Sequence, residues 1–290
     1  MTKRKLAFSV LEIAVLLIII SLITVGIMRG TSIVRSARLS SARSLTVKSH
    51  ISEIPGMIAW YENSLLESFS QDQATTTAQL TEWRDTSPDS IAAQKNKLTR
   101  SASSSVTYQS DGINNLPSVQ FISSGSLALS LFAQGNLGQG TLFAVIRPAI
   151  APSGTVMHIV DSSTSAAGTS AFGITNNQVS IDLGSGQSTG TTTNAASFVE
   201  NSDYILAVYY NGANSKAFVN DADTMAGGSA ISAGNNSLDG LTIGNNRSLS
   251  KPFIGLISEI IVYNRPLSIE ERKSVMSYLS KKYKIRVVGT

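Results

Sequence analysis

The sequence predicts a mainly β protein: an antiparallel β-sandwich that follows one long N-terminal helix and precedes a short C-terminal one. Three observations support this class. After residue 55, short runs rich in β-branched and aromatic residues alternate with Gly, Asn, Ser and Asp. Before residue 55 the apolar pattern is helical, and near the C-terminus a helix-capping pattern precedes an apolar face. The composition, 42% hydrophobic and 14% charged, indicates a folded chain.

Residues 8–28 form an apolar run, FSVLEIAVLLIIISLITVGIM, in which Glu12 is the only charged side chain. A helix of about 20 residues crosses a hydrocarbon core of ~30 Å. Lys3, Arg4 and Lys5 precede the run, and the positive-inside rule keeps such an end in the cytoplasm. We therefore expect a single-pass inner-membrane protein with a cytoplasmic N-terminus and a periplasmic head, which later reaches an extracellular filament or the cell surface.

The helical pattern continues beyond the apolar run. Apolar residues recur at roughly helical spacing, with neither Gly nor Pro between Gly30 and Pro55. Pro55 and Gly56 are expected to end the helix. We predict one helix over residues 8–53.

The segment KRKLAFSVLEIAVLLIIISLI resembles the class III leader and first helix of type IV pilins and type II secretion pseudopilins. This resemblance covers residues 3–28 and implies a leader at residues 1–7. It also implies cleavage by a prepilin peptidase between Ala7 and Phe8, and N-methylation of Phe8. Ala7 stands where the family usually has Gly.

The same resemblance implies that Glu12 takes part in filament assembly. A carboxylate within an apolar helix is costly unless it has a partner. The terminal ammonium of the mature chain, on the same or a neighbouring subunit, is the partner we expect. The alternative is a simple signal anchor whose Glu12 extends to the membrane interface.

The head is expected to be an antiparallel sandwich or jelly roll, because several strand-like runs are joined by turn-rich loops. No fixed-period repeat is evident. The runs are SVQFI at 118–122, TLFAVIRP at 141–148, YILAVYYNG at 204–212, KAFVN at 216–220, LTIGNN at 241–246 and FIGLISEIIVYN at 253–264.

A C-terminal helix is predicted over residues 268–283. Ser268 and Glu271 have the spacing of a capping box. The apolar face of this helix consists of Val275, Met276, Leu279 and Tyr283.

The head resembles the concanavalin A-like, laminin-G-like jelly-roll domains of exported bacterial proteins. The motifs that carry this resemblance are IPGMIAWYENS at 54–64, LTEWRDTSPDS at 80–90, INNLPSVQF at 113–121 and GLISEIIVYNRPLSIEERKSVMSYLSKKY at 255–283. The resemblance implies a mainly β chain with a concanavalin A-like head over residues 54–290, after a stalk over 8–53.

No catalytic residue is predicted. The chain has no cysteine, and its two histidines, His50 and His158, are far apart in sequence, so a histidine-based triad or zinc cluster is poorly supported. The acidic pairs along the chain fall in turns. Carboxylates that meet from different strands cannot be seen in a sequence, so a hydrolase remains an alternative.

The candidate ligand-binding residues are Tyr108, Tyr210, Asp221 and Asp223, because lectin-like folds bind sugars by aromatic stacking and polar loop groups. For both tyrosines, core packing is the alternative. We predict no cofactor and no metal site, with calcium as the alternative, because no EF-hand pattern is present. A calcium ion would take its oxygen ligands from Asp221, Asp223, Asp239, Asn235 and Asn236.

These patterns together predict a minor pilin or pseudopilin of a type IV pilus-like filament, whose lectin-like head serves adhesion or glycan or protein recognition. One alternative is a type II secretion pseudopilin whose head binds cargo or tip subunits without glycan. The other is a membrane-anchored polysaccharide hydrolase. Expected partners are other pilin subunits, the prepilin peptidase, the inner membrane, and surface glycans or secreted proteins. The formal net charge of +4 gives no nucleic-acid footprint.

Overall fold

The computed structural model describes residues 9–88, 96–101, 104–150, 156–162, 170–175, 178–183, 198–212, 214–223 and 238–288. The chain divides into two compact units, Met1–Ser41 and Ala42–Thr290. The second unit contains every strand of the described residues, and we call it the head.

The N-terminal helix α1 covers Val10–Val47. Its first turn is closed by a reciprocal pair of hydrogen bonds. The amide of Ser9 donates to Glu12 Oε2 at 2.7 Å, and the amide of Glu12 donates to Ser9 Oγ at 3.2 Å. This is a capping box, which satisfies amides that have no partner within the helix. Glu12 therefore has a local structural role that its assignment to filament assembly did not include.

The predicted single helix over residues 8–53 is wrong, because α1 ends at Val47. Ser49 has an extended backbone (φ −74°, ψ 136°), and a separate 3-10 helix, η1, covers His50–Glu53. The Ser49 hydroxyl donates a hydrogen bond to the Thr46 carbonyl at 2.8 Å. This side chain thereby satisfies one of the carbonyls at the end of the helix, which have no partner within it. Pro55 and Gly56 follow η1 and do not end α1.

Among the described residues, no helix combines the length and the apolar character needed to cross a lipid bilayer. The prediction of a single-pass inner-membrane protein with a periplasmic head is not supported, and we withdraw it. The leader predicted at residues 1–7 and the Ala7–Phe8 bond lie outside the described residues.

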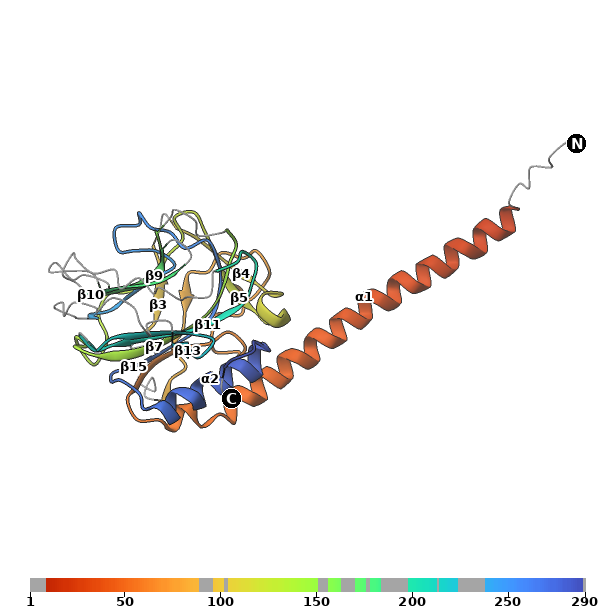
Figure 1. Cartoon of the computed structure of the whole chain (residues 1–290). Helices are drawn as coiled ribbons and strands as arrows, with labels where there is room; N and C mark the ends of the chain where they lie inside the picture. Colours follow the sequence, from red (N-terminus) through yellow and green to blue (C-terminus); the bar gives the residue numbers. More distant parts are fainter. Residues whose placement is uncertain are drawn as a thin grey trace, which may run out of the picture. The chain divides into compact units, whose positions relative to one another are not determined.

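The head is a sandwich of two antiparallel sheets that stack face to face (Figure 1). The eight-stranded sheet has the order β13-β12-β11-β7-β15-β5-β4, with β1 paired to β15. The seven-stranded sheet has the order β10-β9-β8-β14-β6-β3-β2. The strands are β1 Met57–Tyr61, β2 Glu82–Trp83, β3 Leu98–Arg100, β4 Ser105–Gln109, β5 Ser118–Ile122, β6 Leu127–Leu129, β7 Gly140–Pro148, β8 Val156–Asp161, β9 Ser170–Thr175, β10 Gln178–Leu183, β11 Tyr204–Tyr210, β12 Lys216–Val219, β13 Ala222–Asp223, β14 Leu241–Ile243 and β15 Gly255–Tyr263.

The six strand-like runs of the sequence all contain strands of this sandwich, namely β5, β7, β11, β12, β14 and β15. The predicted antiparallel β-sandwich is confirmed. Strand β7 is apolar on both faces because both are covered. Leu142, Ala144 and Ile146 belong to the core between the sheets, whereas Phe143 and Val145 belong to a second core outside the eight-stranded sheet.

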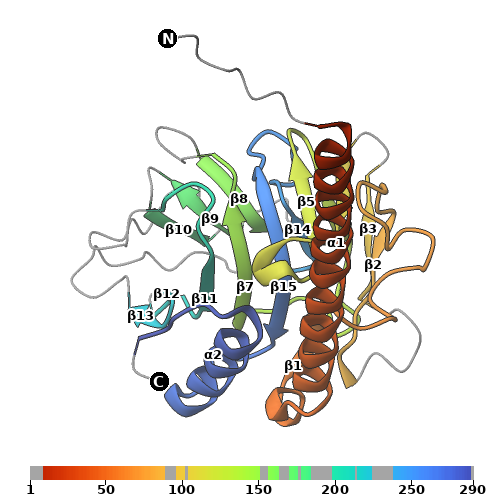
Figure 2. The ribbon, with the colours of Figure 1, turned by 90° about the vertical axis from the view of Figure 1, so that its right-hand side faces the viewer.

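The C-terminal helix α2, Ile269–Tyr283, covers the second core and lies beside β7 and β11 in the head (Figure 2). Ser268 caps it, and both hydrogen bonds of the Ser268–Glu271 capping box are present. The predicted C-terminal helix is thus confirmed. Inside the head, Thr46 also meets α2, because its hydroxyl lies 3.1 Å from the Tyr278 hydroxyl.

Candidate functional site

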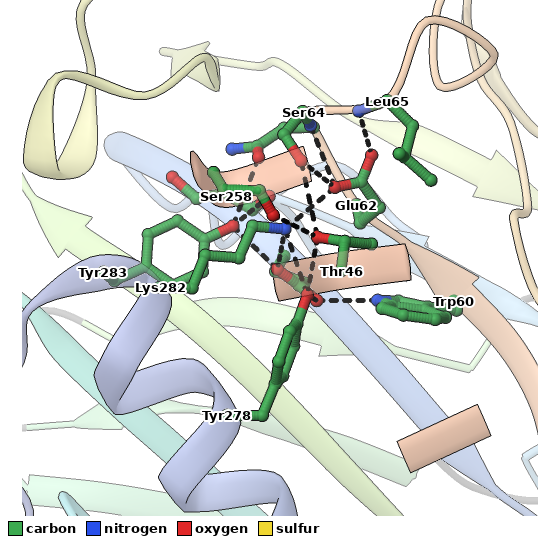
Figure 3. Close-up of polar contacts among 12 residues, drawn as sticks. Thr46, Trp60, Glu62, Ser64, Leu65, Ser258, Tyr278, Lys282 and Tyr283 are labelled. Atoms are coloured by element: carbon green, nitrogen blue, oxygen red, sulfur yellow. Dashed lines mark hydrogen bonds and ion pairs between the residues drawn. The ribbon is translucent and has the colours of Figure 1, made fainter. Parts of the chain in front are cut away.

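A buried network of charges joins three elements of the head (Figure 3). Lys282 of α2 places its Nζ 2.8 Å from Glu62, which follows β1, and 2.8 Å from Glu259 of β15. All three side chains are fully buried. Burial alone would lower the pKa of Lys282, but the two carboxylates raise it well above its ordinary value. Lys282 therefore stays charged, and one cation faces two carboxylates.

Hydrogen bonds satisfy the carboxylate oxygens of this network. Glu259 accepts from Trp60 Nε1 at 2.6 Å and from the hydroxyls of Tyr278 at 3.0 Å and Tyr283 at 2.8 Å. Buried charges are tolerated when their remaining hydrogen-bonding capacity is filled in this way. Glu62 accepts from the Ser64 amide and hydroxyl, the Leu65 amide and the Ser68 hydroxyl.

The network makes the stability of the head sensitive to acid. Burial raises the pKa of Glu62, but the charge and hydrogen bond of Lys282, with hydrogen bonds from Ser64 and Ser68, outweigh it and lower this pKa from 4.5 to about 2. Because the folded-state pKa lies below the unfolded one, the stabilisation is complete above pH ~4.5 and is lost as the pH falls through about 2. We expect the urea concentration at the unfolding midpoint, measured by tryptophan fluorescence, to decrease as the pH is lowered from ~4.5 to about 2.

A Glu62→Gln variant supplies the control for this acid dependence. It should be less stable at pH 6 and lose less of its remaining stability between pH 5 and pH 2. Parallel losses in both proteins would assign the acid sensitivity to other carboxylates.

These two carboxylates do not form a hydrolytic site. Glycoside hydrolysis requires an acid and a second carboxylate on either side of an accessible glycosidic bond. Glu62 and Glu259 are each 0% exposed and share Lys282 as a counter-ion. The network therefore stabilises the fold, and a substrate cannot reach its two carboxylates.

A polar pocket of about 280 Å³ opens on the head and is the candidate binding site. Four neighbouring strands, β4, β5, β15 and β7, contribute to it. Residues next to β4, β7 and β11 complete the wall. Its lining residues are Gln109, Asp111, Gln120, Arg147, Ala149, Asn201, Gly255 and Leu256.

Strand register explains why these side chains meet. Gln120 of β5 is paired with Thr107 on one side and Leu256 on the other, and Leu256 is paired with Arg147. Paired residues of neighbouring strands point to the same face of a sheet. Val119, which alternates with Gln120, belongs to the core between the sheets. The pocket is therefore on the outer face of the eight-stranded sheet.

The pocket presents both hydrogen-bond donors and acceptors. Gln120 Oε1 accepts from Gln109 Nε2 at 2.6 Å and from Thr107 Oγ1 at 3.3 Å, which leaves the Gln120 Nε2 group to donate to a ligand. Arg147 binds Asp203 through two parallel hydrogen bonds of 2.6 and 2.9 Å. Its outer nitrogens can still donate, because the side chain is 27% exposed. The Asp203 carboxylate cancels its charge.

Gly255 allows the strands around the pocket to approach one another. Its φ is +152°, and a Cβ at this position would lie 2.2 Å from the Arg147 carbonyl oxygen. No side chain fits between these strands without moving the backbone. The pocket geometry consequently depends on a residue without a side chain.

The four ligand-binding candidates from the sequence do not meet in one place. Tyr108 is buried, with its ring edge-on to Phe69 at a centroid distance of 5.5 Å, and Tyr210 is also buried in the core. Asp221 pairs with Arg272 of α2 at 2.7 Å. Asp223 lies 3.7 Å from Lys216. A ligand role for these residues stays a prediction.

Calcium binding also stays a prediction. Among the residues that the structure describes, no group of three or more His, Cys, Asp or Glu side chains could hold a metal ion. Asn235 and Asn236 lie outside the described residues. Of the remaining candidates, Asp239 is buried and accepts a hydrogen bond from the Gly240 amide at 2.9 Å.

Comparison with known proteins agrees with the sandwich. The sequence profile of the Concanavalin A-like lectin/glucanases superfamily matches residues 123–271, which is more than half of the chain. No curated protein matches.

Two solved structures share the fold. A sialidase of Trypanosoma rangeli, solved with sialic acid, superposes with a TM-score of 0.50 and 13% identity over 78% of this chain and 33% of its own. The binding domain of Paraclostridial Mosquitocidal Protein 1 gives a TM-score of 0.54 and 14% identity over 80% of this chain and 53% of its own. The chain thus spans about a third of the first protein and about half of the second.

Proposed function

Because the chain belongs to the Concanavalin A-like lectin/glucanases superfamily, we propose that its head binds a glycan in the polar pocket. The observation that carries this proposal is the row of Thr107, Gln120, Leu256 and Arg147 across four strands. Amide and guanidinium groups match the alternating donors and acceptors of sugar hydroxyls. Leu256 offers an apolar surface for a sugar ring.

The charges around the pocket favour a neutral glycan. Arg147 is paired with Asp203 at 2.6 Å, and Asp111 adds a carboxylate to the lining. An anionic sugar would need an uncompensated cation, as a strong charge-assisted contact does. The proposal is therefore a neutral oligosaccharide, in contrast to the sialic acid of the sialidase structure.

A glycan array tests this assignment with the full chain kept in mild detergent. We expect binding to a set of neutral glycans and little binding to sialylated ones. A folded protein that binds no glycan contradicts the proposal. Binding restricted to sialylated glycans contradicts the neutral class and would place the ligand carboxylate near Arg147.

We further propose that α1 assembles with helices of other subunits in a pilin-like filament, which carries the head as its recognition module. The observation that favours this role is the number of exposed apolar side chains on α1, including Val10 (85% exposed), Leu11 (73%) and Leu22 (68%). Exposed apolar side chains in this number mark a surface that another protein surface covers. A pseudopilin of a secretion system would use the same contacts.

Processing at the Ala7–Phe8 bond tests the filament role separately. After co-expression with a prepilin peptidase, intact mass should show loss of residues 1–7 and addition of one methyl group to Phe8. The chain expressed without the peptidase should keep its full mass. An uncut chain beside an active peptidase contradicts the filament role and leaves the glycan proposal unchanged.

We propose a binding role for the head and no hydrolysis. The buried state of Glu62 and Glu259 supports this, since neither carboxylate is exposed. Near the pocket, the Asp203 carboxylate is paired with Arg147. Asp111 is the single acid among the described lining residues, whereas glycoside hydrolysis requires two carboxylates.

A further inference from the structure

A groove of about 730 Å³ lies within the head, between its α1 residues, η1 and α2. Leu45, Ile51 and Ile54 supply apolar groups to its lining. Lys273 and Lys281 of α2 line it together with Ser277, and the spacing of four residues places these three along one face of the helix. Lys48 also lines the groove.

The lysines of the groove keep a net positive charge. None of the ion pairs found within the described residues uses Lys48, Lys273 or Lys281. Glu53 follows Lys48 in the sequence, but its Oε2 atom lies 3.1 Å from Nδ1 of His50 and is not paired with a lysine of the groove. A partner for this groove should therefore bring an apolar side chain and a carboxylate together.

The head itself carries such a pair in the segment Leu66–Glu67, which we call the knob. Leu66 is 78% exposed, the largest exposed fraction of any large hydrophobic residue described in the head. Glu67 beside it is also exposed. The knob is absent from the lining of the groove of its own chain.

The knob is held in place by the buried network. On one side of it, the Leu65 amide donates to Glu62 Oε1 at 2.5 Å, and on the other the Ser68 hydroxyl donates to the same oxygen at 2.6 Å. Because both flanks are fixed to one buried carboxylate, little conformational entropy remains to be lost when the knob docks.

We propose that the knob of one copy docks in the groove of a second copy, with Leu66 on the apolar lining and Glu67 among the lysines. The contact uses two different surfaces, so every bound copy still offers one free knob and one free groove. Such heterologous contacts propagate a chain of subunits and do not close a symmetric dimer. This interface involves the head alone and is independent of the glycan pocket.

Cysteine crosslinking tests the contact, because the chain has no native cysteine. Full-length Leu66→Cys protein is mixed with Ser277→Cys protein in detergent and oxidised mildly. Cysteine keeps the knob apolar. We expect a mixed dimer in several-fold excess over a control mixture of Leu131→Cys with Ser277→Cys, since Leu131 is also exposed, at 56%. Mixed dimers no more abundant than the control contradict the proposal, as does preferential pairing of Leu66→Cys with itself.

Charge reversal provides a second readout. Adding Glu67→Lys to the knob protein should abolish the crosslink, and so should adding Lys273→Glu and Lys281→Glu to the groove protein. Combining both sets should restore it, because the charges are again complementary. A crosslink yield that stays unchanged in the charge-reversed variants contradicts the role of the lysines. Glycan binding should be unchanged in all these variants, which separates this contact from the proposed function.

Discussion

Replacing Lys282 with methionine should lower the free energy of unfolding by about 3–5 kcal/mol. The substitution keeps much of the side-chain volume but removes the Lys282 ammonium, which lies 2.8 Å from both Glu62 and Glu259. Two carboxylates then remain buried beside each other without a counter-ion, and each must be protonated or exposed for the fold to persist. Urea unfolding at pH 7, followed by tryptophan fluorescence, measures the loss directly.

Lys281→Met is the matched control, because Lys281 precedes Lys282 on the same helix but is exposed. Its effect should stay within about 0.5 kcal/mol. Adding Glu62→Gln and Glu259→Gln to Lys282→Met should recover part of the stability, since the uncompensated charges are removed. Equal effects of Lys282→Met and Lys281→Met would show that the network does not contribute in this way.

Gly255→Ala should destabilise the head by roughly 2–5 kcal/mol. The added Cβ would lie 2.2 Å from the Arg147 carbonyl oxygen and 3.0 Å from both Pro148 Cα and the Phe253 ring. The backbone of β7 or β15 must move to make room, and both strands line the pocket. Thermal unfolding should show a large fall in Tm, accompanied by a weaker affinity for glycan.

Gly138→Ala is the control for this substitution, because a Cβ at Gly138 meets no atom within 4 Å. It should leave the Tm nearly unchanged. A Gly255→Ala protein as stable as Gly138→Ala would mean that β7 and β15 have more freedom to separate than this geometry allows.

Local patterns were sufficient to predict five strands of the eight-stranded sheet but, in the seven-stranded sheet, β14 alone. Each run of alternating or continuous apolar residues bounded by turn residues became a strand, and SVQFI coincides with β5 at Ser118–Ile122. The Ser268–Glu271 pattern predicted the start of α2, because a capping box depends only on residues three positions apart.

The predicted end of the N-terminal helix failed for a local reason. Proline and glycine at 55 and 56 were strong stop signals, but the helix ends earlier, where the Ser49 hydroxyl binds the Thr46 carbonyl at 2.8 Å. Serine side chains compete with backbone hydrogen bonds in this way, yet they are tolerated in many helices. A pattern of residue types cannot show which serine will do so.

The buried network and the pocket could not be predicted, because both depend on tertiary contacts. Lys282 and Glu62 are 220 positions apart. In a sequence, Lys282 looks like one more exposed lysine beside Lys281. The pocket depends on strand register, which aligns Gln120 with Leu256 and Leu256 with Arg147. The one available signal was the polar side chain of Gln120, which stands between Val119 and Phe121 in β5.

The most direct test of the account is the affinity of the full chain for the glycan that binds best on the array, measured by titration calorimetry. Gln120→Ala removes a donor from the pocket lining and should weaken binding about tenfold, the effect of losing about 1.4 kcal/mol. Gln139→Ala, at an exposed position outside the pocket lining, should leave the affinity unchanged. Equal affinities of the wild type and both variants would contradict glycan recognition at this pocket.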